Sequence, residues 1–233
     1  MLRLDDFMSD VKTGLLILNK PVGPTSHDMI NKLRRITGIK KIGHAGTLDP
    51  FASGVLVVAI GREATREIDK FMKLDKEYIA MLRFGFLSDT FDRMGEITKW
   101  PSEVKEIDAD EVKKTLQRFI GEQDQLPPMF SAKKINGKKL YELARKGKTV
   151  VRQSARINIY NIELLKYKWP TLEIKIKCSS GTYIRALAND IGASLNCGAY
   201  LENLKRTSVG SYREEEAISI EKITRDNWSE FFI

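Results

Sequence analysis

The chain has 233 residues, of which 42% are hydrophobic and 30% charged, with a formal net charge of +8. This composition suits one large folded domain and excludes a disordered chain. No apolar run approaches the ~20 residues that a membrane-spanning helix needs, and the N-terminus has no signal-peptide pattern, so we expect a soluble, cytoplasmic protein.

The first predicted elements are a strand, a helix and a glycine-rich loop. The apolar run 15–18 predicts a buried strand. Thr25 and Asp28 have the spacing of a capping box, and Gly38 marks the end of the helix that follows. The loop 43–50 reads GHAGTLDP, and the β-branched run 55–60 behind it predicts a central strand.

The GHAGTLDP loop holds an imidazole and a carboxylate in one short segment. Gly43 and Gly46 are expected to take left-handed or closely approached conformations, and Pro50 biases Asp49 toward an extended one. A rigid position next to a strand is what a catalytic group requires. Taken alone, the Asp-Pro pair is a common turn device, and it favours an ordinary turn aspartate at Asp49.

The second half mixes strands and helices without regular alternation. Residues 78–84 predict a strand, and 110–120 an amphipathic helix with Ile120 on its apolar face. Apolar residues alternate strictly over 172–178, which predicts a half-solvated strand. We therefore expect an α+β fold around a mixed, largely antiparallel sheet flanked by helices.

Positive charge is concentrated in two segments. Residues 131–152 hold eight basic residues against the single acid Glu142, and five basic residues without an acid lie between Asn31 and His44. Such concentration is typical of proteins that bind a phosphate backbone, and we expect 131–152 to be a basic arm that contacts RNA. The cations assigned to this role are Lys133, Lys134, Lys138, Lys139, Arg145 and Lys146. A solvated surface is the alternative.

The segment SGTYIR, residues 180–185, turns a strand into a helix that begins with Tyr183 and Arg185. An arginine at this place can pair with a carboxylate on a neighbouring loop and keep it ionised. The alternative is an arginine on the solvent face of the helix. The cysteines and histidines form no cluster, so we expect neither a metal nor a disulfide framework.

Six motifs occur in one order along the chain, and together they resemble the TruB-type tRNA pseudouridine-55 synthases from about residue 14 to 212. They are LNKPVGPTSHD, KIGHAGTLDPFASGVL, KEYIAMLRFGFLSDTFDRMGE, QLPPMFSAKKINGKKLYELARKG, CSSGTYIRALANDIG and CGAYLENLKRTSVG. The resemblance implies isomerisation of uridine 55 in the tRNA T-loop to pseudouridine, on a base flipped out of its stack. It implies that no cofactor is needed and that the partner is a tRNA T-stem-loop. We further expect a monomer without an obligate protein partner.

The resemblance also assigns roles to individual residues. Asp49 matches the catalytic carboxylate, Tyr78 the active-site tyrosine that stacks on the base, and Arg185 the arginine that pairs with the carboxylate. Substrate-binding positions are further matched by His44, Leu204 and Lys20. Whether Asp49 acts as a nucleophile or as a base stays open.

The expected organisation is an N-terminal extension at 1–13, a catalytic domain at 14–212 and a C-terminal tail at 213–233 without a full PUA domain. The last ~15 residues are expected to lie outside the packed unit. Two further functions are considered, a tRNA folding chaperone and a guide-RNA-dependent pseudouridylase. Tritium release from 5-labelled uridine in a tRNA transcript separates catalysis from folding assistance.

Overall fold

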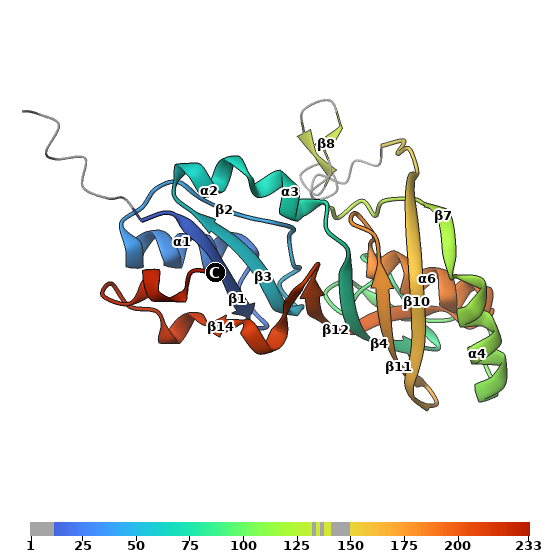
Figure 1. Cartoon of the computed structure of the whole chain (residues 1–233). Helices are drawn as coiled ribbons and strands as arrows, with labels where there is room; N and C mark the ends of the chain where they lie inside the picture. Colours follow the sequence, from blue (N-terminus) through green and yellow to red (C-terminus); the bar gives the residue numbers. More distant parts are fainter. Residues whose placement is uncertain (1–11, 132–133, 136–137, 141–149) are drawn as a thin grey trace, which may run out of the picture. The chain divides into compact units, whose positions relative to one another are not determined.

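The structure is a computed structural model that describes residues 12–131, 134–135, 138–140 and 150–233. Contacts divide the chain into two compact units (Figure 1). Unit 1 comprises Met1–Met72 and Ser208–Ile233, and unit 2 comprises Lys73–Thr207. The domain boundaries expected at residues 13 and 212 stay predictions.

The sheet of unit 1 is built on two long neighbouring strands. The strand β1 (Gly14–Lys20) pairs antiparallel with β3 (Ser53–Ile60), and the short strand β2 (Ile42–His44) pairs with the same β3. Residues 55–60 are fully buried, because β3 has a strand on each edge and side chains packed on both faces. The predicted central strand is confirmed.

The helix α1 (Ser26–Thr37) begins and ends where its local chemistry predicts. Thr25 and Asp28 form the reciprocal capping box, and Gly38 ends the helix with a left-handed φ of 72°. Its apolar side packs on the sheet of unit 1. The shared core includes Leu16, Leu18, Met29, Ile30, Leu33, Leu56, Val58 and Ile60.

Two short helices, α2 (Arg62–Arg66) and α3 (Ile68–Met72), follow β3. Thr13 fixes the start of α2, since its hydroxyl donates to the Ile60 carbonyl at 2.9 Å and accepts from the Ala64 amide at 3.2 Å. The helix α2 lies beside β2 (Figure 1), where the Thr65 methyl group faces Gly43.

The C-terminal residues are part of the core of unit 1, so the expectation that the last ~15 residues lie outside it is wrong. The strand β14 (Ile218–Ser219) pairs parallel with β1, and Ile220 and Ile223 are buried against the same core. The amide of Ile233 donates to the Leu15 carbonyl at 3.1 Å. The segment has no hydrophobic period that predicts this burial, because it contains short 3-10 turns: η2 (Glu214–Glu216), η3 (Ile220–Lys222) and η4 (Trp228–Phe231).

Unit 2 contains a sheet in the order β12-β4-β11-β10-β7. The strands are β4 (Lys76–Phe84), β7 (Gly121–Gln125), β10 (Ala155–Lys168), β11 (Thr171–Cys178) and β12 (Ala199–Val209). The last two residues of β12 belong to unit 1 and pair with β13 (Tyr212–Arg213). The pairs β4–β11, β10–β11 and β7–β10 are antiparallel. The predicted α+β fold with a mixed, largely antiparallel sheet is confirmed.

Two helices cover the buried face of this sheet. The helix α4 (Ala109–Arg118) packs against β10 and against α6 (Ile184–Ser194), which packs against β4 (Figure 1). The alternation predicted for β11 holds, since Leu172, Ile174, Ile176 and Cys178 are all fully buried. Ile120 is 37% exposed, contrary to the expected apolar helix face, because α4 ends at Arg118 and the helical period ends with it.

Two hairpins complete the described part. Strands β5 (Phe86–Ser88) and β6 (Ile97–Lys99) flank the loop 89–96, and β8 (Lys134–Ile135) pairs with β9 (Lys138–Lys139). Lys133, Arg145 and Lys146 of the predicted basic arm lie outside the described residues, and only the backbone is described for Lys134, Lys138 and Lys139.

Candidate functional site

Asp49 is the first residue of a tight turn between β2 and β3 in unit 1. The Ala52 amide donates to the Asp49 carbonyl at 3.0 Å, which closes a four-residue turn with Pro50 in its second position, where the fixed φ of proline is favourable. Gly46 has a φ of 94°, as expected. Gly43 does not need to be glycine for conformational reasons: it lies in β2, and an added Cβ would make only ordinary contact with Thr65.

The ammonium group of Lys20 ties the backbone of this turn to the end of β1. Lys20 is 0% exposed, and its Nζ donates to the carbonyls of Ala52 at 2.7 Å, Pro21 at 2.8 Å and Pro50 at 3.5 Å. The Gly23 amide also donates to the Pro50 carbonyl, at 2.8 Å. Lys20 therefore positions the turn that carries Asp49, while its expected contact with substrate stays a prediction.

Ser26 holds the residue before Asp49 from the other side. Its Oγ accepts from the Leu48 amide at 2.9 Å and donates to the Leu48 carbonyl at 3.1 Å, and both residues are buried. Sequence reasoning missed this residue. The one available signal was a second hydroxyl directly after the helix-capping Thr25, which a surface position would explain equally well.

His44 is the last residue of β2, opposite Val58 of β3, and is partly buried. The chain leaves the strand there and enters the turn, and the next residue, Ala45, donates its amide to the Val57 carbonyl at 2.9 Å. Unit 1 thus carries Lys20, His44 and Asp49 on one continuous, hydrogen-bonded framework.

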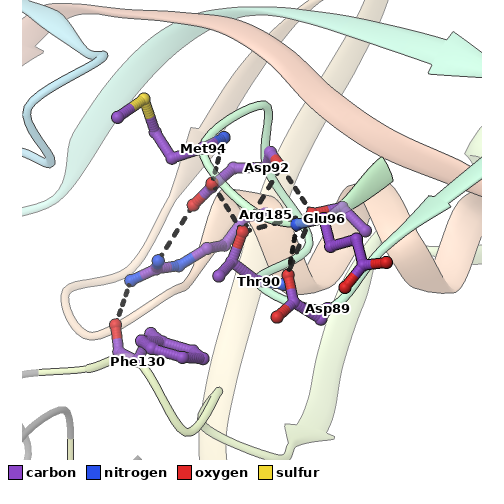
Figure 2. Close-up of polar contacts among 8 residues, drawn as sticks. Asp89, Thr90, Asp92, Met94, Glu96, Phe130 and Arg185 are labelled. Carbon is purple, nitrogen blue, oxygen red and sulfur yellow. Dashed lines mark hydrogen bonds and ion pairs between the residues drawn. The ribbon is translucent and has the colours of Figure 1, made fainter. Parts of the chain in front are cut away.

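In unit 2, Arg185 is buried and its side chain bridges two other segments. Its Nη1 lies 3.1 Å from Oδ2 of Asp92, and its Nη2 donates to the Phe130 carbonyl at 2.7 Å. Figure 2 shows the guanidinium reaching from the carboxylate of Asp92 to that carbonyl. At 7% exposure, Arg185 is not the solvent-facing residue that was the alternative reading. Its predicted pairing with Asp49 stays a prediction.

Asp92 is held by the loop 89–96, which sequence reasoning did not connect with Arg185. Its Oδ1 accepts from the Thr90 hydroxyl at 2.8 Å and from the Met94 amide at 2.9 Å (Figure 2). The Ser88 hydroxyl donates to the Asp92 carbonyl at 2.6 Å. The Thr90 and Met94 donors, together with Arg185, fix the Asp92 carboxylate in place.

The same loop has two backbone features that restrict its sequence. Phe91 has a φ of 65°, a left-handed conformation that is unfavourable for an aromatic residue. An added Cβ at Gly95 would collide with the side chains of Ser88, Asp89 and Thr90. Strained positions persist where surrounding contacts enforce them, and here those contacts are the ones that hold Asp92.

The start of α6 is anchored by a buried amide side chain. The Nε2 of Gln125 donates to the Tyr183 carbonyl at 3.0 Å, and its Oε1 accepts from the Tyr183 amide at 2.8 Å. Thr182 donates to the Ser179 carbonyl at 2.9 Å in the preceding turn. Arg185 therefore projects from a helix start whose backbone is fixed on both sides.

Tyr78 and Leu204 lie on other strands of unit 2. Tyr78, 8% exposed, is on β4 opposite Ile176 of β11, and Leu204 is buried on β12. Lys76 is two residues before Tyr78 and on the same face of β4. Burial, and next the positive charge of buried Arg206, lower the pKa of Lys76 to about 8. The roles of Tyr78 and Leu204 stay predictions.

The root of the basic arm is packed. Pro127, Pro128 and Ser131 are buried, and Arg152 donates to the Pro127 carbonyl at 2.9 Å. The arm thus leaves unit 2 from a fixed base that includes Phe130, the residue whose carbonyl binds Arg185.

Three further candidate features concern the described part of the chain: metal sites, membrane spans and reactive cysteines. Within these ranges no three His, Cys, Asp or Glu side chains come close enough to hold a metal ion. No described helix is long and apolar enough to cross a membrane. Cys178 and Cys197 are free and buried, and burial raises the pKa of their thiols to about 12 and about 11.

Two protein-family models together match residues 34–230 of the chain. Residues 34–184 match the model of the TruB family pseudouridylate synthase N-terminal domain, and residues 185–230 match the tRNA pseudouridylate synthase B C-terminal domain.

Curated relatives cover most of the chain. A tRNA pseudouridine synthase B of Clostridium novyi (strain NT) is 46% identical over 94% of this chain and 75% of its own length. The protein of the same name from Protochlamydia amoebophila (strain UWE25) is 48% identical over 88% of this chain and 78% of its own length.

Solved structures are also similar. A Cbf5-Nop10-Gar1 complex contains a chain with a TM-score of 0.70 and 30% identity, covering 89% of this chain and 52% of that one. A chain of an H/ACA RNP bound to a substrate RNA containing 2′-deoxyuridine has a TM-score of 0.68 and 28% identity, covering 93% and 55%. This chain therefore spans about half the length of those solved chains. On the family model and the curated relatives, the chain belongs to the TruB family of pseudouridylate synthases.

Proposed function

We propose that this enzyme converts uridine 55 in the T-loop of tRNA to pseudouridine, with Asp49 as its catalytic carboxylate. The observation that carries the proposal is the Asp49 turn itself, which is held by buried contacts from Lys20 and Ser26 in a chain of this family. The names of the curated relatives support tRNA as the substrate.

The reaction is an isomerisation, so its atoms balance without an external reactant. The N1–C1′ bond of the uridine breaks, the uracil rotates, and a C5–C1′ bond forms. The proton on C5 leaves, and N1 of the product carries a proton. Asp49 acts in this sequence as a nucleophile or as a base at the ribose or the uracil.

The remaining residues receive supporting roles in this proposal. Tyr78 stacks on the flipped uracil, replacing part of the stacking that the base loses when it leaves the loop. His44, Lys20 and Leu204 line the space for the flipped nucleotide. Arg185 pairs with the catalytic carboxylate, and its bonds to Asp92 and Phe130 fix the direction of the guanidinium.

The test is tritium release from a tRNA transcript labelled at C5 of its uridines. The purified chain should release one equivalent per tRNA, and a transcript with cytidine at position 55 should release none. Equal release from both transcripts would place the reaction at another uridine. No release from either, with faster tRNA folding, would favour the chaperone alternative.

Running the same assay without guide RNA or partner proteins tests the other alternative. Release under these conditions rules out a dependence on guide RNA. We also propose that the chain acts as a monomer, and light scattering of the active protein checks this. Cytoplasmic location stays a prediction.

A further inference from the structure

The basic stretch between Asn31 and His44 divides in the structure into cations that hold the fold and cations that do not. Arg34 is structural: its guanidinium donates to the Asn31 side chain at 3.0 Å and to the carbonyls of Lys40 at 3.1 Å and Ile42 at 3.4 Å. Lys32 forms an ion pair with Glu221 at 3.2 Å. Neither residue needs a ligand to explain it.

The side chains of Lys40 and Lys41, unlike those of Arg34 and Lys32, do not hold the fold. In the structure, two arginines of α2 lie near them. The Gly61 amide donates to the Lys41 carbonyl at 2.9 Å, which places Lys41 beside the start of α2 with its Arg62 and Arg66. The side chains of all four are exposed. Within the described residues, none of the four side chains makes a hydrogen bond or an ion pair. We call these four residues the α2 basic patch.

The patch contains like charges at positions where they destabilise the helix α2. Arg62 and Arg66 are four residues apart on α2, a spacing at which like charges oppose helix formation. Glu63 is the acid within α2, and Glu67, directly after the helix, is engaged by Lys70. A surface of this composition gains most from an anionic ligand that spans several charges.

The patch lies at the near end of the segment that leads to Asp49. Lys41 directly precedes β2, and His44 ends that strand, so the two lie roughly 10 Å apart by strand rise. The turn of Asp49 follows at once. A nucleic-acid strand with its target uridine at this turn would bring phosphates of nearby nucleotides into reach of long, flexible Lys and Arg side chains.

We propose that the α2 basic patch binds the phosphate backbone of the substrate RNA near the target nucleotide, as a second contact surface besides the basic arm at 131–152. This rests on the proposed function in taking the substrate to be tRNA. The contacts are to phosphates and add affinity without reading sequence.

The test compares two double variants that each remove two positive charges from exposed side chains of unit 1. Lys41→Ser/Arg62→Ser changes the patch, and Lys222→Ser/Arg225→Ser changes the C-terminal segment. Binding of the full chain to unmodified tRNA transcript is measured across salt concentrations. The patch variant should lower the log–log salt slope by roughly 1.5 and weaken binding about tenfold at ~0.1 M salt. The control should stay within about twofold of wild type, because the proposal assigns Lys222 and Arg225 no phosphate contact.

A charge-keeping variant, Lys41→Arg/Arg62→Lys, separates phosphate contact from structure and should bind like wild type. The proposal is overturned if the patch and control variants weaken binding equally, if neither changes the salt slope, or if the charge-keeping variant also loses affinity. Binding is measured without turnover. An absence of tritium release from wild-type protein would therefore count against the proposed function and not against the patch.

Discussion

The Asp49 turn in unit 1 is held through backbone atoms, whereas Arg185 in unit 2 is held through its own side chain. Lys20, Gly23 and Ser26 bind carbonyls and amides of residues 48–52, and none of these bonds uses the Asp49 carboxylate. The guanidinium of Arg185, by contrast, itself makes the bonds to Asp92 and Phe130.

This difference determines what a substitution reports. Replacing the Asp49 side chain changes chemistry and leaves the bonds from Lys20, Gly23 and Ser26 to the turn in place. Replacing Arg185 changes chemistry and geometry together, because the bonds that orient the group disappear with it. The effects of substitutions in the two units are therefore not equivalent even when both abolish activity.

The largest effect is expected for Asp49→Asn. Loss of the carboxylate charge should lower the single-turnover rate by at least about 10³-fold, while tRNA affinity stays within about threefold, since the turn keeps its backbone bonds. Tritium release and filter binding measure the two quantities. Asp69→Asn, on α3, is the control. Turnover by Asp49→Asn protein free of deamidation would contradict the catalytic assignment.

The second effect concerns Arg185→Lys, which keeps the charge and removes the planar fork. An ammonium cannot reach Asp92 and the Phe130 carbonyl in the same geometry, so we expect a rate loss of at least about 10²-fold. Arg156→Lys, an exposed pair with Glu122, is the matched control and should stay near wild type. A near-normal rate for Arg185→Lys would show that charge alone suffices.

Ser26→Ala tests the backbone framework of unit 1. It leaves the buried amide and carbonyl of Leu48 without their hydroxyl partner, which should reduce the free energy of unfolding by about 2–4 kcal/mol. Activity should fall about tenfold as the turn loosens. Thr37→Ala, at the other end of α1, also removes two hydroxyl bonds but lies away from the turn. Equal activity losses in the two variants would contradict the positioning role of Ser26.

The smallest effect depends on pH and concerns Lys76 of unit 2. Its pKa is about 8 in the folded protein and 10.5 for an ordinary lysine. Between these values the unfolded chain binds more protons, so the stability of wild type relative to Lys76→Met should rise with pH by at most about 3 kcal/mol. Below pH 8 the difference should be constant.

Urea unfolding from pH 7 to 10.5 measures this difference. Lys177→Met, which removes the same charge from an exposed position on β11, is the matched control. A difference for Lys76→Met that does not change between pH 8 and 10.5 would show that this lysine keeps its proton in the folded protein.

The sequence by itself determined the features that depend on local chemistry. The capping box of Thr25 and Asp28, the stop at Gly38, and the alternation along β11 each follow from neighbouring residues, because caps and pleats are local. The family also followed from the order of six motifs, and it predicted Asp49, Tyr78 and Arg185 as site residues.

Only the tertiary structure decided which distant groups support those residues. Asp92 lies 93 positions from Arg185, and Ser26 lies 22 positions from Leu48, so no local pattern links them. The burial of Ile220 and Ile223 against the core that contains β1 could not be predicted from the sequence either, because residues in 3-10 turns have no regular hydrophobic period. The same holds for Arg62 beside Lys41. Both charges can be read from the sequence, but their proximity depends on the backbone bond from the Gly61 amide to the Lys41 carbonyl.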